Sequence, residues 1–276
     1  MPHSAARHFR TIDGHTRRTI PNGMHVTATH ASNQDTLPLR VCYRAEANGQ
    51  MTKDSIHQRP GWTKSYLLHL NDHVAGFGSI AVAGPWENKP TVFEFYILPE
   101  YRGRAFDLFE AFVAASDARF FEVQTSDSLL TVMLYTYGCE LVSESIVFRD
   151  ELTTSLPSQG AALKRVTSEA ESMRCFEVRR GHSEWQIELE ATAIGNGGLT
   201  FHYNHPYCDV YMEIVEASRR RGLGAYFVQE LKRIAYEFGG IPTARCSPKN
   251  IASRRTLQKA GFVPFAHIVD GKIAIS

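Results

Sequence analysis

A short stretch in the last third of the chain combines charge with backbone freedom in a way that suits phosphate binding. Two glycines two residues apart let the backbone turn tightly and approach a ligand closely. A helix that begins there presents unpaired N–H groups, which fit a polyphosphate. The stretch therefore predicts a phosphate cradle in which backbone amides and arginine charge act together. Its residues are Arg219, Arg220, Arg221, Gly222, Leu223, Gly224 and Ala225.

Two other chemistries could use residues in this region. His202, His205, Cys208 and Asp209 are ligand types that suit zinc. They form one short cluster in a connection between two expected strands, so we predict no metal and expect them to line the mouth of a ligand site. The arginine run could serve nucleic acid, but the formal net charge is only +1 and no aromatic residues are interleaved with the arginines. We therefore predict no nucleic-acid partner.

The elements on either side of the cradle must hold it in place. The apolar run Val210 to Val215 predicts a strand, Asp209–Val215, that leads into the arginines. We expect a helix to begin at the glycines, because apolar residues recur on one face until Gly239 and Gly240 end it. That apolar face consists of Leu223, Phe227, Leu231, Ile234, Ala235 and Phe238.

After this helix the sequence predicts a strand, a helix and a hairpin. The strand is Thr243–Ser247, and Asn250 can cap a helix that Gly261 ends. Phe262–Ile268 is then expected to turn through Asp270–Gly271 into a last strand.

Before the cradle, strict alternation of apolar and polar residues predicts a strand over Trp185–Ile194. Asn196–Gly198 predicts the hairpin turn that follows it, and Leu199–Tyr203 the return strand. Leu163–Val166 is an expected strand, and a helical region runs from there to about Arg179.

The first half of the chain shows a similar order of elements. Three expected strands form an antiparallel meander, and a helix with apolar residues from Phe106 to Val113 follows. A strand at Phe120–Gln124 leads to a second helix, which Ser126 or Asp127 could cap and Gly138 ends. The meander strands are Ser65–Leu70, Val74–Ala83 and Thr91–Leu98, with Glu144–Phe148 as a closing strand.

Length and composition fit two globular domains. The chain has 276 residues, and about 150 residues make an ordinary domain. A linker rich in Thr, Ser and Pro spans residues 150–160 and divides the chain, so we predict one domain at 23–152 and a second at 160–276. Residues 1–22 form a predicted leader, which is either an extension or disordered. Five cysteines without a C-x-x-C pair, and no apolar run of membrane length, predict a reduced cytoplasmic protein with no membrane partner.

The two halves look like an internal duplication that has diverged at the cradle. Arg102 corresponds to Arg219, and Gly138 corresponds to Gly261. Where the second half has two glycines, the first has Ala105 and Asp107, and the added side chain and negative charge both oppose phosphate binding. We therefore expect one working site, in the second half.

The quoted motifs resemble the GNAT acetyltransferase superfamily. The sequence [Q/R]-x-x-G-x-[G/A] after a strand is present as Arg219, Gly222 and Gly224. A second family motif is present as Asn250, Ser253, Leu257, Gly261 and Phe262. The resemblance covers about residues 160–276 well and 24–150 as a degenerate copy, and the tandem layout is similar to that of mycothiol synthase.

The resemblance implies an α+β (mixed α/β) fold of two tandem GNAT-like domains, each a splayed, mostly antiparallel sheet flanked by helices. It implies acetyl-CoA as the co-substrate, with its pyrophosphate on the cradle. The pantetheine arm would lie between Asp209–Val215 and Thr243–Ser247, accept main-chain hydrogen bonds from Ile214, Val215 and Glu216, and be flanked by Asn250 and Ser253.

Acetyl transfer to an amine requires a base for the ammonium proton and an acid for the departing thiolate. Asp209, Glu213 and, through water, Tyr211 are the candidate bases. Many family members use a tyrosine as the acid, but the matching position here is Leu257, which leaves Tyr203, Tyr207, Tyr226 or water.

We accordingly expect an N-acetyltransferase, monomeric or homodimeric, that acts on a primary amine of a small molecule or peptide. The acceptor is not specified by the sequence, because variable loops build acceptor pockets. The alternative is a non-catalytic acyl-CoA-binding or sensing protein, which the missing tyrosine favours.

Overall fold

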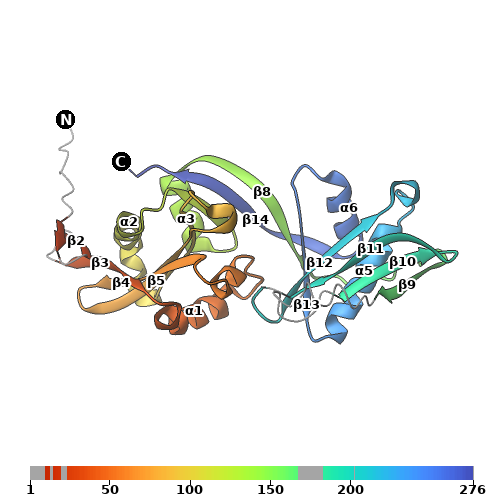
Figure 1. The fold of residues 1–276 in the computed structure, drawn as a ribbon, viewed down its shortest axis with the longest axis horizontal. Helices are drawn as coiled ribbons and strands as arrows, with labels where there is room; N and C mark the ends of the chain where they lie inside the picture. The colour runs from red at the N-terminus through yellow and green to blue at the C-terminus, as the bar shows by residue number, and fades with distance from the viewer. Residues whose placement is uncertain (1–9, 13–14, 20–23, 167–182, 202, 276) are drawn as a thin grey trace. The chain divides into compact units, whose positions relative to one another are not determined.

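The computed structural model describes residues 10–12, 15–19, 24–166, 183–201 and 203–275. The chain divides into two compact units, each built from more than one segment. Unit 1 comprises Met1–Asn48, Ile56–Val142 and Val269–Ser276, and unit 2 comprises Gly49–Ser55 and Ser143–Ile268. Figure 1 shows the elements of both units along the chain.

Unit 1 is a mixed sheet with helices. Its first six strands form an antiparallel meander in chain order, and the next, β7 (Phe120–Gln124), pairs in parallel with β6. The helices are α1 (Asn33–Ala47), α2 (Ala105–Ser116) and α3 (Ser128–Tyr137). The meander strands are β1 (Arg10–Ile12), β2 (His15–Thr19), β3 (His25–Ala31), β4 (Thr63–Leu70), β5 (His73–Ala81) and β6 (Thr91–Ile97).

Local sequence explains where these helices begin. Ser32 and Asp35 form a capping box at the start of α1, each side chain bonding the other's backbone N–H. Asp127 caps α3 by accepting a hydrogen bond from the Leu130 N–H at 2.9 Å, which confirms one of the two predicted caps. Helix α2 buries Phe109 and Phe112 completely in the core of unit 1.

Unit 2 repeats this plan. Four strands, β9 to β12, form an antiparallel meander, and β13 (Ile241–Cys246) pairs in parallel with β12 (Tyr207–Ile214). Beyond β13 lies β8, antiparallel to it, and then β14. The remaining strands are β8 (Gly138–Asp150), β9 (Ala161–Val166), β10 (Ser183–Leu189), β11 (Thr192–Thr200) and β14 (Phe262–Ile273).

Two helices lie in the described part of unit 2. Helix α5 (Leu223–Glu237) buries Leu223, Phe227 and Leu231 in the core, as its sequence pattern predicts. Helix α6 (Ile251–Lys259) begins at the predicted cap, because Asn250 Oδ1 accepts a hydrogen bond from the Ser253 N–H at 3.0 Å. The mixed α/β class predicted for the chain is confirmed.

Both sheets are splayed at their parallel pair of strands. In unit 2 the pairing of β12 with β13 ends at Asp209 and Thr243, so residues 210–214 of β12 lack this neighbour. In unit 1 the pairing of β6 with β7 ends at Val92 and Phe121. Unit 2 therefore opens between β12 and β13, the fourth and fifth strands of the run β9 to β13, as predicted, and unit 1 opens between its sixth and seventh strands, β6 and β7.

One predicted hairpin turn is wrong. The turn lies at Glu190–Ala191, where both residues have positive φ (51° and 60°), and β11 continues through Asn196–Gly198. Gly197 lies opposite β12 instead, where an added Cβ would lie 2.5 Å from the Tyr211 carbonyl oxygen. This glycine serves close strand packing rather than a turn, and the real turn has no glycine to mark it.

Other expectations also need correction. Strand β14 continues through Asp270–Gly271, so the predicted last turn is wrong. Residues 10–12 and 15–19, placed in an unassigned leader, form β1 and β2. The predicted helical region up to Arg179 lies outside the described residues beyond Val166.

The compact units differ from the predicted domain ranges in three places. Gly49–Ser55 and Ser143–Asp150 belong to unit 2, although both precede the predicted linker. Val269–Ser276 belongs to unit 1, although it ends the chain. Strands β8 and β14 each contribute residues to both units, so neither unit is a single continuous segment. No helix in the described ranges is long and apolar enough to span a membrane.

Candidate functional site

The predicted cradle forms a tight loop between β12 and α5. Arg220 and Gly222 have positive φ, 62° and 83°, and Gly222 is the N-cap of α5. Along α5, Ala225 and Tyr226 are the first residues whose N–H groups donate hydrogen bonds, and both donate to the Gly222 carbonyl oxygen. Within the described chain, the N–H groups of Arg221, Gly222, Leu223 and Gly224 have no hydrogen-bond acceptor, so an anion could bind all four.

Arg219 anchors this loop to the strand that precedes it. Its Nε donates to the Ile214 carbonyl oxygen at 2.7 Å, and its guanidinium lies 3.6 Å from the Glu213 carboxylate. In unit 1, Arg102 Nε donates to the Ile97 carbonyl oxygen at 3.1 Å, over the same five-residue spacing. The predicted correspondence of the two arginines is therefore confirmed, and Arg219 has a structural role in addition to any charge it offers a ligand.

The unit 1 loop lacks the other features of the cradle. Helix α2 begins from Arg104, which has a φ of −119°, and the Asp107 carboxylate lies in its first turn, 3.8 Å from Arg104. A negative charge there occupies the position that favours anions. This geometry agrees with the expectation of a single cradle, in unit 2.

Two residues distant in sequence also border the unit 2 loop. Gln159 Nε2 donates to the Arg221 carbonyl oxygen at 2.7 Å. An added Cβ on Gly222 would lie 3.2 Å from Gln159 Nε2 and 3.4 Å from Lys259 Nζ. Sequence analysis missed both residues, because neither lies in the cradle motif.

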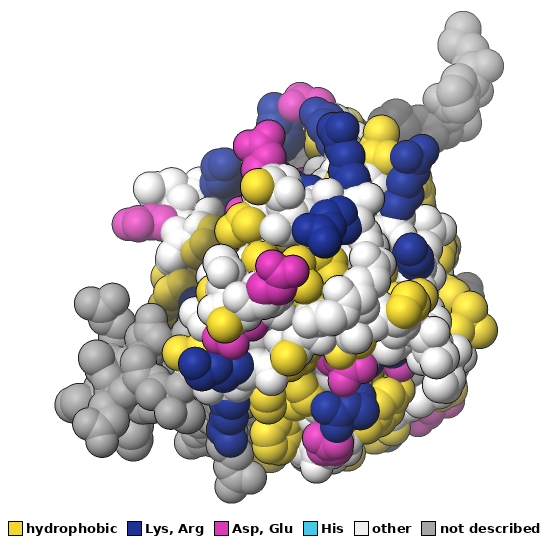
Figure 2. All heavy atoms as spheres, turned by 90° about the vertical axis from the view of Figure 1, so that its right-hand side faces the viewer, with side chains coloured by type: hydrophobic (Ala, Val, Ile, Leu, Met, Phe, Trp, Pro, Cys, Tyr) yellow, Lys and Arg dark blue, Asp and Glu magenta, His cyan; other side chains and the backbone are white. Residues whose placement is uncertain are grey.

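The cradle carries cationic groups that form no ion pair with the described carboxylates. Among the described residues, Arg220, Arg221 and Lys259 are exposed and form no ion pair. Figure 2, which views the molecule from the right-hand side of Figure 1, shows Lys and Arg side chains gathered in the upper half of that face. Such a charge distribution attracts a polyanion and strengthens its binding at low ionic strength.

The splay offers backbone groups to an extended ligand. The Val215 N–H bonds to the Ile194 carbonyl oxygen of β11, whereas the Cys208 carbonyl oxygen faces β13 and accepts from Thr243 Oγ1. Because backbone direction alternates along a strand, Val210, Met212 and Ile214 present their main-chain groups to the splay. The predicted contact at Ile214 fits this pattern, and the one at Val215 does not.

Asp209 lies at the closed end of the splay, where β12 still pairs with β13. Its Oδ2 accepts hydrogen bonds from Arg245 Nε at 3.0 Å and from the Tyr203 hydroxyl at 3.4 Å, and its side chain is 13% exposed. Arg245 also bonds to the Tyr203 oxygen and lies over its ring. The Gln50 amide acts to lower the pKa of this carboxyl.

These neighbours shift the ionisation of the cluster. Burial raises the pKa of the Asp209 carboxyl, and Arg245, Gln50 and Tyr203 offset only part of that rise. Burial and the Asp209 charge raise the pKa of the Tyr203 hydroxyl, so it stays protonated. Burial opposes the charge on Arg245, but Asp209 and Tyr203 hold its pKa above the usual value. Asp209 is thus a carboxylate with increased basicity beside permanent donors.

Gln50 reaches this cluster through a short segment of the first half of the sequence. Gly49–Ser55 belongs to unit 2, and Asn204, itself 6% exposed, binds its backbone on both sides of Gln50. Asn204 Nδ2 donates to the Gly49 carbonyl oxygen at 2.9 Å, and Asn204 Oδ1 accepts from the Met51 N–H at 2.7 Å. No sequence motif marks Gln50, Asn204 or Arg245, since their roles depend on long-range contacts.

The remaining predicted residues are distributed around the splay. Glu213 is 76% exposed and close to the cradle, and Tyr211 lies on the same face of β12 and is exposed. Val215 and Glu216 are exposed in the loop before the cradle. Asn250 and Ser253 are joined by the cap of α6. Leu257 is a core residue at 5% exposure. Its hydrocarbon side chain has no acidic proton to donate.

Of the described residues weighed as zinc ligands, Cys208 and Asp209 do not point toward one another. Cys208 is buried in the core of unit 2, and burial raises the pKa of its thiol to about 12. Asp209 is the next residue along β12, so its side chain points to the opposite face of the sheet. His202 lies outside the described residues.

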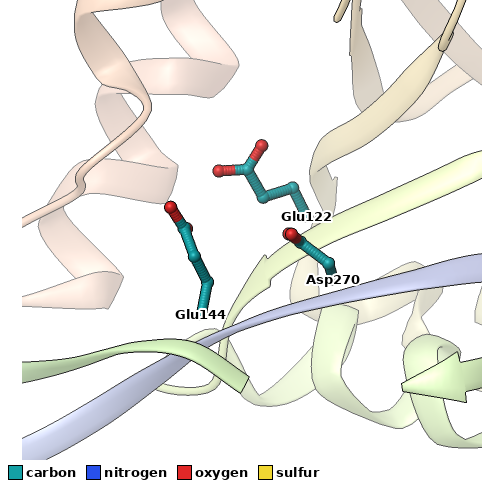
Figure 3. A group of neighbouring side chains, drawn as sticks. All are labelled: Glu122, Glu144 and Asp270. Atoms are coloured by element: carbon teal, nitrogen blue, oxygen red, sulfur yellow. The ribbon is translucent and has the colours of Figure 1, made fainter. Parts of the chain in front are cut away.

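Figure 3 labels a different group of carboxylates, Glu122 on β7, Asp270 on β14 and Glu144 on β8. Glu122 accepts a hydrogen bond from the Trp86 indole at 2.5 Å. Glu122 and Asp270 belong to unit 1 and Glu144 to unit 2, so we assign no metal site to this group.

Comparison with known protein families finds a model that matches part of the chain. Residues 141–263 match the family model described as "Acetyltransferase (GNAT) domain". No curated protein matches the chain.

Several solved structures share the fold. An acetyltransferase from the GNAT family of Colwellia psychrerythraea is 12% identical, with a TM-score of 0.67, covering 89% of this chain and 99% of its own. A tandem GNAT protein from the clavulanic acid biosynthesis pathway is 12% identical, with a TM-score of 0.57, covering 91% of this chain and 99% of its own. A GCN5-related N-acetyltransferase from Sphaerobacter thermophilus is 11% identical, with a TM-score of 0.57 and coverages of 91% and 97%.

Proposed function

We propose that this protein transfers an acetyl group from acetyl-CoA to a primary amine of a small molecule or peptide, since residues 141–263 match the model of the GNAT acetyltransferase domain. The observation that carries the proposal is the cradle at the start of α5, where four N–H groups have no acceptor among the described residues, set at the open end of the splay. Such a cradle suits a pyrophosphate, and the splay suits a narrow, extended arm that carries amides.

In this proposal the pyrophosphate binds the N–H groups of residues 221–224, with Arg220, Arg221 and Lys259 adding charge. The pantetheine arm follows β12 and pairs with the main chain of Val210, Met212 and Ile214. From Ile214 back to Asp209 the strand spans about 17 Å, so an extended arm brings the thioester toward the closed end. Asn250 and Ser253 would flank the arm on the side of α6.

The reaction forms a C–N bond and breaks the C–S bond of the thioester. Asp209 is the best candidate to remove the ammonium proton, because its carboxylate is held at the closed end and burial raises its pKa toward neutrality. Glu213 is less suitable, because a largely exposed carboxylate near the cradle is neither desolvated nor close to that end.

Tyr203 is the tyrosine that lies nearest to this chemistry among the three weighed. Its hydroxyl lies beside Asp209 and Arg245, but burial and Asp209 raise its pKa and make it a weak acid, so water is the better proton source for the departing thiolate. The proposal also includes a cytoplasmic location, a monomer or homodimer, and no nucleic-acid partner; the four described cysteines are free thiols.

Calorimetry with CoA tests the binding part of the proposal. We expect about one site per chain, and Gly224→Asp should abolish it, because a carboxylate would enter the anion site. The matched control is Gly103→Asp in the unit 1 loop, where an added Cβ meets nothing within 4 Å. Two equivalent sites, or unchanged binding in Gly224→Asp, would contradict the proposal.

Turnover separates the enzyme from the alternative of a non-catalytic acyl-CoA sensor. The absence of a tyrosine at Leu257 is the observation that favours the sensor. Acetyl-CoA incubated with a panel of amines should release free thiol in proportion to acetylated amine. Tight CoA binding with no thiol release above the hydrolytic background would favour the sensor.

A further inference from the structure

The linker at residues 150–160 is bonded along helix α5 and ends at the cradle. Gln229 Oε1, in the middle of the helix, accepts hydrogen bonds from the Thr154 hydroxyl at 2.8 Å and the Leu156 N–H at 2.7 Å. Farther along the linker, Gln159 Nε2 donates to the Arg221 carbonyl oxygen, in the loop before the helix, at 2.7 Å. The linker therefore runs antiparallel to α5, and both belong to unit 2.

The bond from Gln159 fixes one peptide group of the cradle. A trans peptide is planar, and its C=O and N–H point in opposite directions. A donor on the Arg221 carbonyl oxygen therefore directs the Gly222 N–H to the other side of the loop. That N–H is one of the four that have no acceptor among the described residues. Gln159 thus orients a group that an anion in the cradle would bind, and the bond also polarises the peptide in favour of a stronger donor.

The backbone at Gln159 has a conformation that glutamine rarely adopts. Gln159 and Gly160 both have positive φ, 52° and 82°. The Ala161 N–H donates to the Ser158 carbonyl oxygen at 2.9 Å, which closes a type I′ turn around them. The first central position of such a turn favours Asn, Asp or Gly, because these residues tolerate the left-handed region. The turn by itself would accordingly be more stable with Asn or Gly in place of Gln159.

We propose that Gln159 is a positioning residue for the CoA cradle, present despite the preference of its own turn because its side chain reaches the Arg221 carbonyl oxygen. The inference rests on the proposed function, since the cradle is the part that would bind CoA. A residue that breaks a local rule while gaining a specific contact is expected beside functional sites. The linker then connects the two halves of the sequence and also orients the pyrophosphate site.

The first test compares stability with affinity in Gln159→Asn and Gln159→Gly, both in the full chain. Each replacement fits the turn, and neither has the reach of glutamine. We expect the urea midpoint of unfolding to stay the same or rise, whereas the Kd for CoA rises about fivefold. The Kd for inorganic pyrophosphate should rise by a similar factor, because the lost contact concerns the cradle alone.

A matched control is available at another turn with positive φ. Ala191, exposed in the turn between β10 and β11, has a φ of 60°. Ala191→Asn and Ala191→Gly should also keep or raise the urea midpoint, but they should leave both Kd values unchanged. In steady-state kinetics the Gln159 variants should raise the KM for acetyl-CoA and change kcat by less than about twofold, since the contact is made before and during the reaction alike.

A second measurement requires no variant. In the NMR spectrum of the unaltered protein, addition of inorganic pyrophosphate should shift the Gly222 amide resonance. Gln159→Gly should reduce this shift at equal occupancy, because the N–H is then no longer held toward the ligand.

The outcomes separate the inference from the proposed function. Unchanged Kd values in both Gln159 variants would overturn the inference and leave the proposed function intact. A fall in the urea midpoint that accompanies the loss of affinity would also overturn it, since Gln159 would then serve the turn. Tight CoA binding without acetyl transfer would refute the proposed function, and the Kd comparison would still decide the role of Gln159. A protein that binds neither CoA nor pyrophosphate would overturn both.

Discussion

Asp209 is subject to two opposing influences that together set its basicity. Burial raises its pKa, and the donors around it lower that pKa by a smaller amount. A base works best when its pKa lies near the working pH and its position is fixed. Burial moves the pKa of Asp209 up from its usual value, and Arg245 and Tyr203 hold its carboxylate in place by hydrogen bonds.

Replacing Asp209 by Asn should separate chemistry from binding. Asp209→Asn keeps the size of the side chain and removes its basicity, so we expect kcat to fall about 100-fold with little change in acetyl-CoA affinity. Raising the pH should restore part of the rate, because the acceptor amine then loses its proton to solvent. Steady-state kinetics across pH measure both effects.

Glu213→Gln is the comparison for this variant, since Glu213 is exposed on the same strand. A loss of rate in Glu213→Gln together with near-native rate in Asp209→Asn would reverse the assignment of the base.

Lys259 should contribute to CoA affinity through charge alone. Lys259→Ala removes an exposed ammonium group that lies close to Gly222, and we expect the Kd for CoA to rise about fivefold at low ionic strength. The effect should shrink as salt is added, because exposed charges are screened. Calorimetry at two salt concentrations measures it, with Lys249→Ala, exposed just before α6, as control. An equal rise in Kd at both salt concentrations would rule out a purely electrostatic contribution.

At the scale of elements, buried polar bonds secure the ends of helices and the connections between them. Lys232 of α5 is 5% exposed, and its Nζ binds Asp150 at 2.5 Å and the carbonyl oxygens of Leu152 and Ala260 at 2.9 and 2.7 Å. One ammonium group of α5 thus bonds both to the start of the linker and to the end of α6. In unit 1 a single carboxylate, Asp127, caps α3 and also accepts a hydrogen bond from the Tyr43 hydroxyl.

Asp127 should make the stability of unit 1 depend on pH. Burial raises its pKa from 3.8 to about 6, so the folded state binds a proton that the unfolded state releases between those values. This contribution to stability is present below pH 4 and is lost as pH rises through 6. The loss is roughly 3 kcal/mol for a shift of this size.

Urea unfolding at several pH values tests this with Asp127→Asn, which retains an N-cap side chain and does not titrate. The difference in free energy of unfolding between the original protein and the variant should fall by roughly 2 kcal/mol from pH 4 to pH 6, which is most of the total loss. Asp72→Asn, at an exposed turn, should show no such trend. A constant difference across this range would show that Asp127 is ionised throughout.

At the scale of the molecule, the two units are assembled from interleaved segments. Strand β13 has β8 as its antiparallel neighbour over Ile146–Arg149, and β8 begins before the predicted linker. A fragment that starts at residue 155 lacks this strand and Gly49–Ser55 as well. Its sheet would therefore end at β13 with an exposed, unpaired edge.

We expect the fragment 155–276 to be insoluble or partly unfolded. A fragment that starts at residue 143 regains residues 143–150 of β8 and should be more soluble, although it still lacks Gly49–Ser55 of unit 2. Gel filtration and circular dichroism compare their folding, and thiol release compares their activity. A soluble 155–276 fragment with full activity would contradict the need for either segment.

The sequence predicted local features better than long-range ones. The cradle, α5 and the caps at Asp127 and Asn250 were predictable, because each depends on residues within a few positions of one another. The hairpin at Glu190–Ala191 could not be predicted. Gly195 and Gly197 allow close packing of the strands, but glycines at such spacing are also typical of a turn. Asn204 was missed because its hydrogen bonds with Gly49 and Met51 join positions more than 150 residues apart.

The interleaved strands also affect how the protein can be made in a cell. Unit 1 includes Val269–Ser276, so its sheet cannot be complete until the ribosome has translated these residues. At about 5–20 residues per second, the 126 residues between Val142 and Val269 delay completion by roughly 6–25 s. During that interval the nascent chain exposes β7 without its β14 neighbour, an unpaired edge that a chaperone could shield.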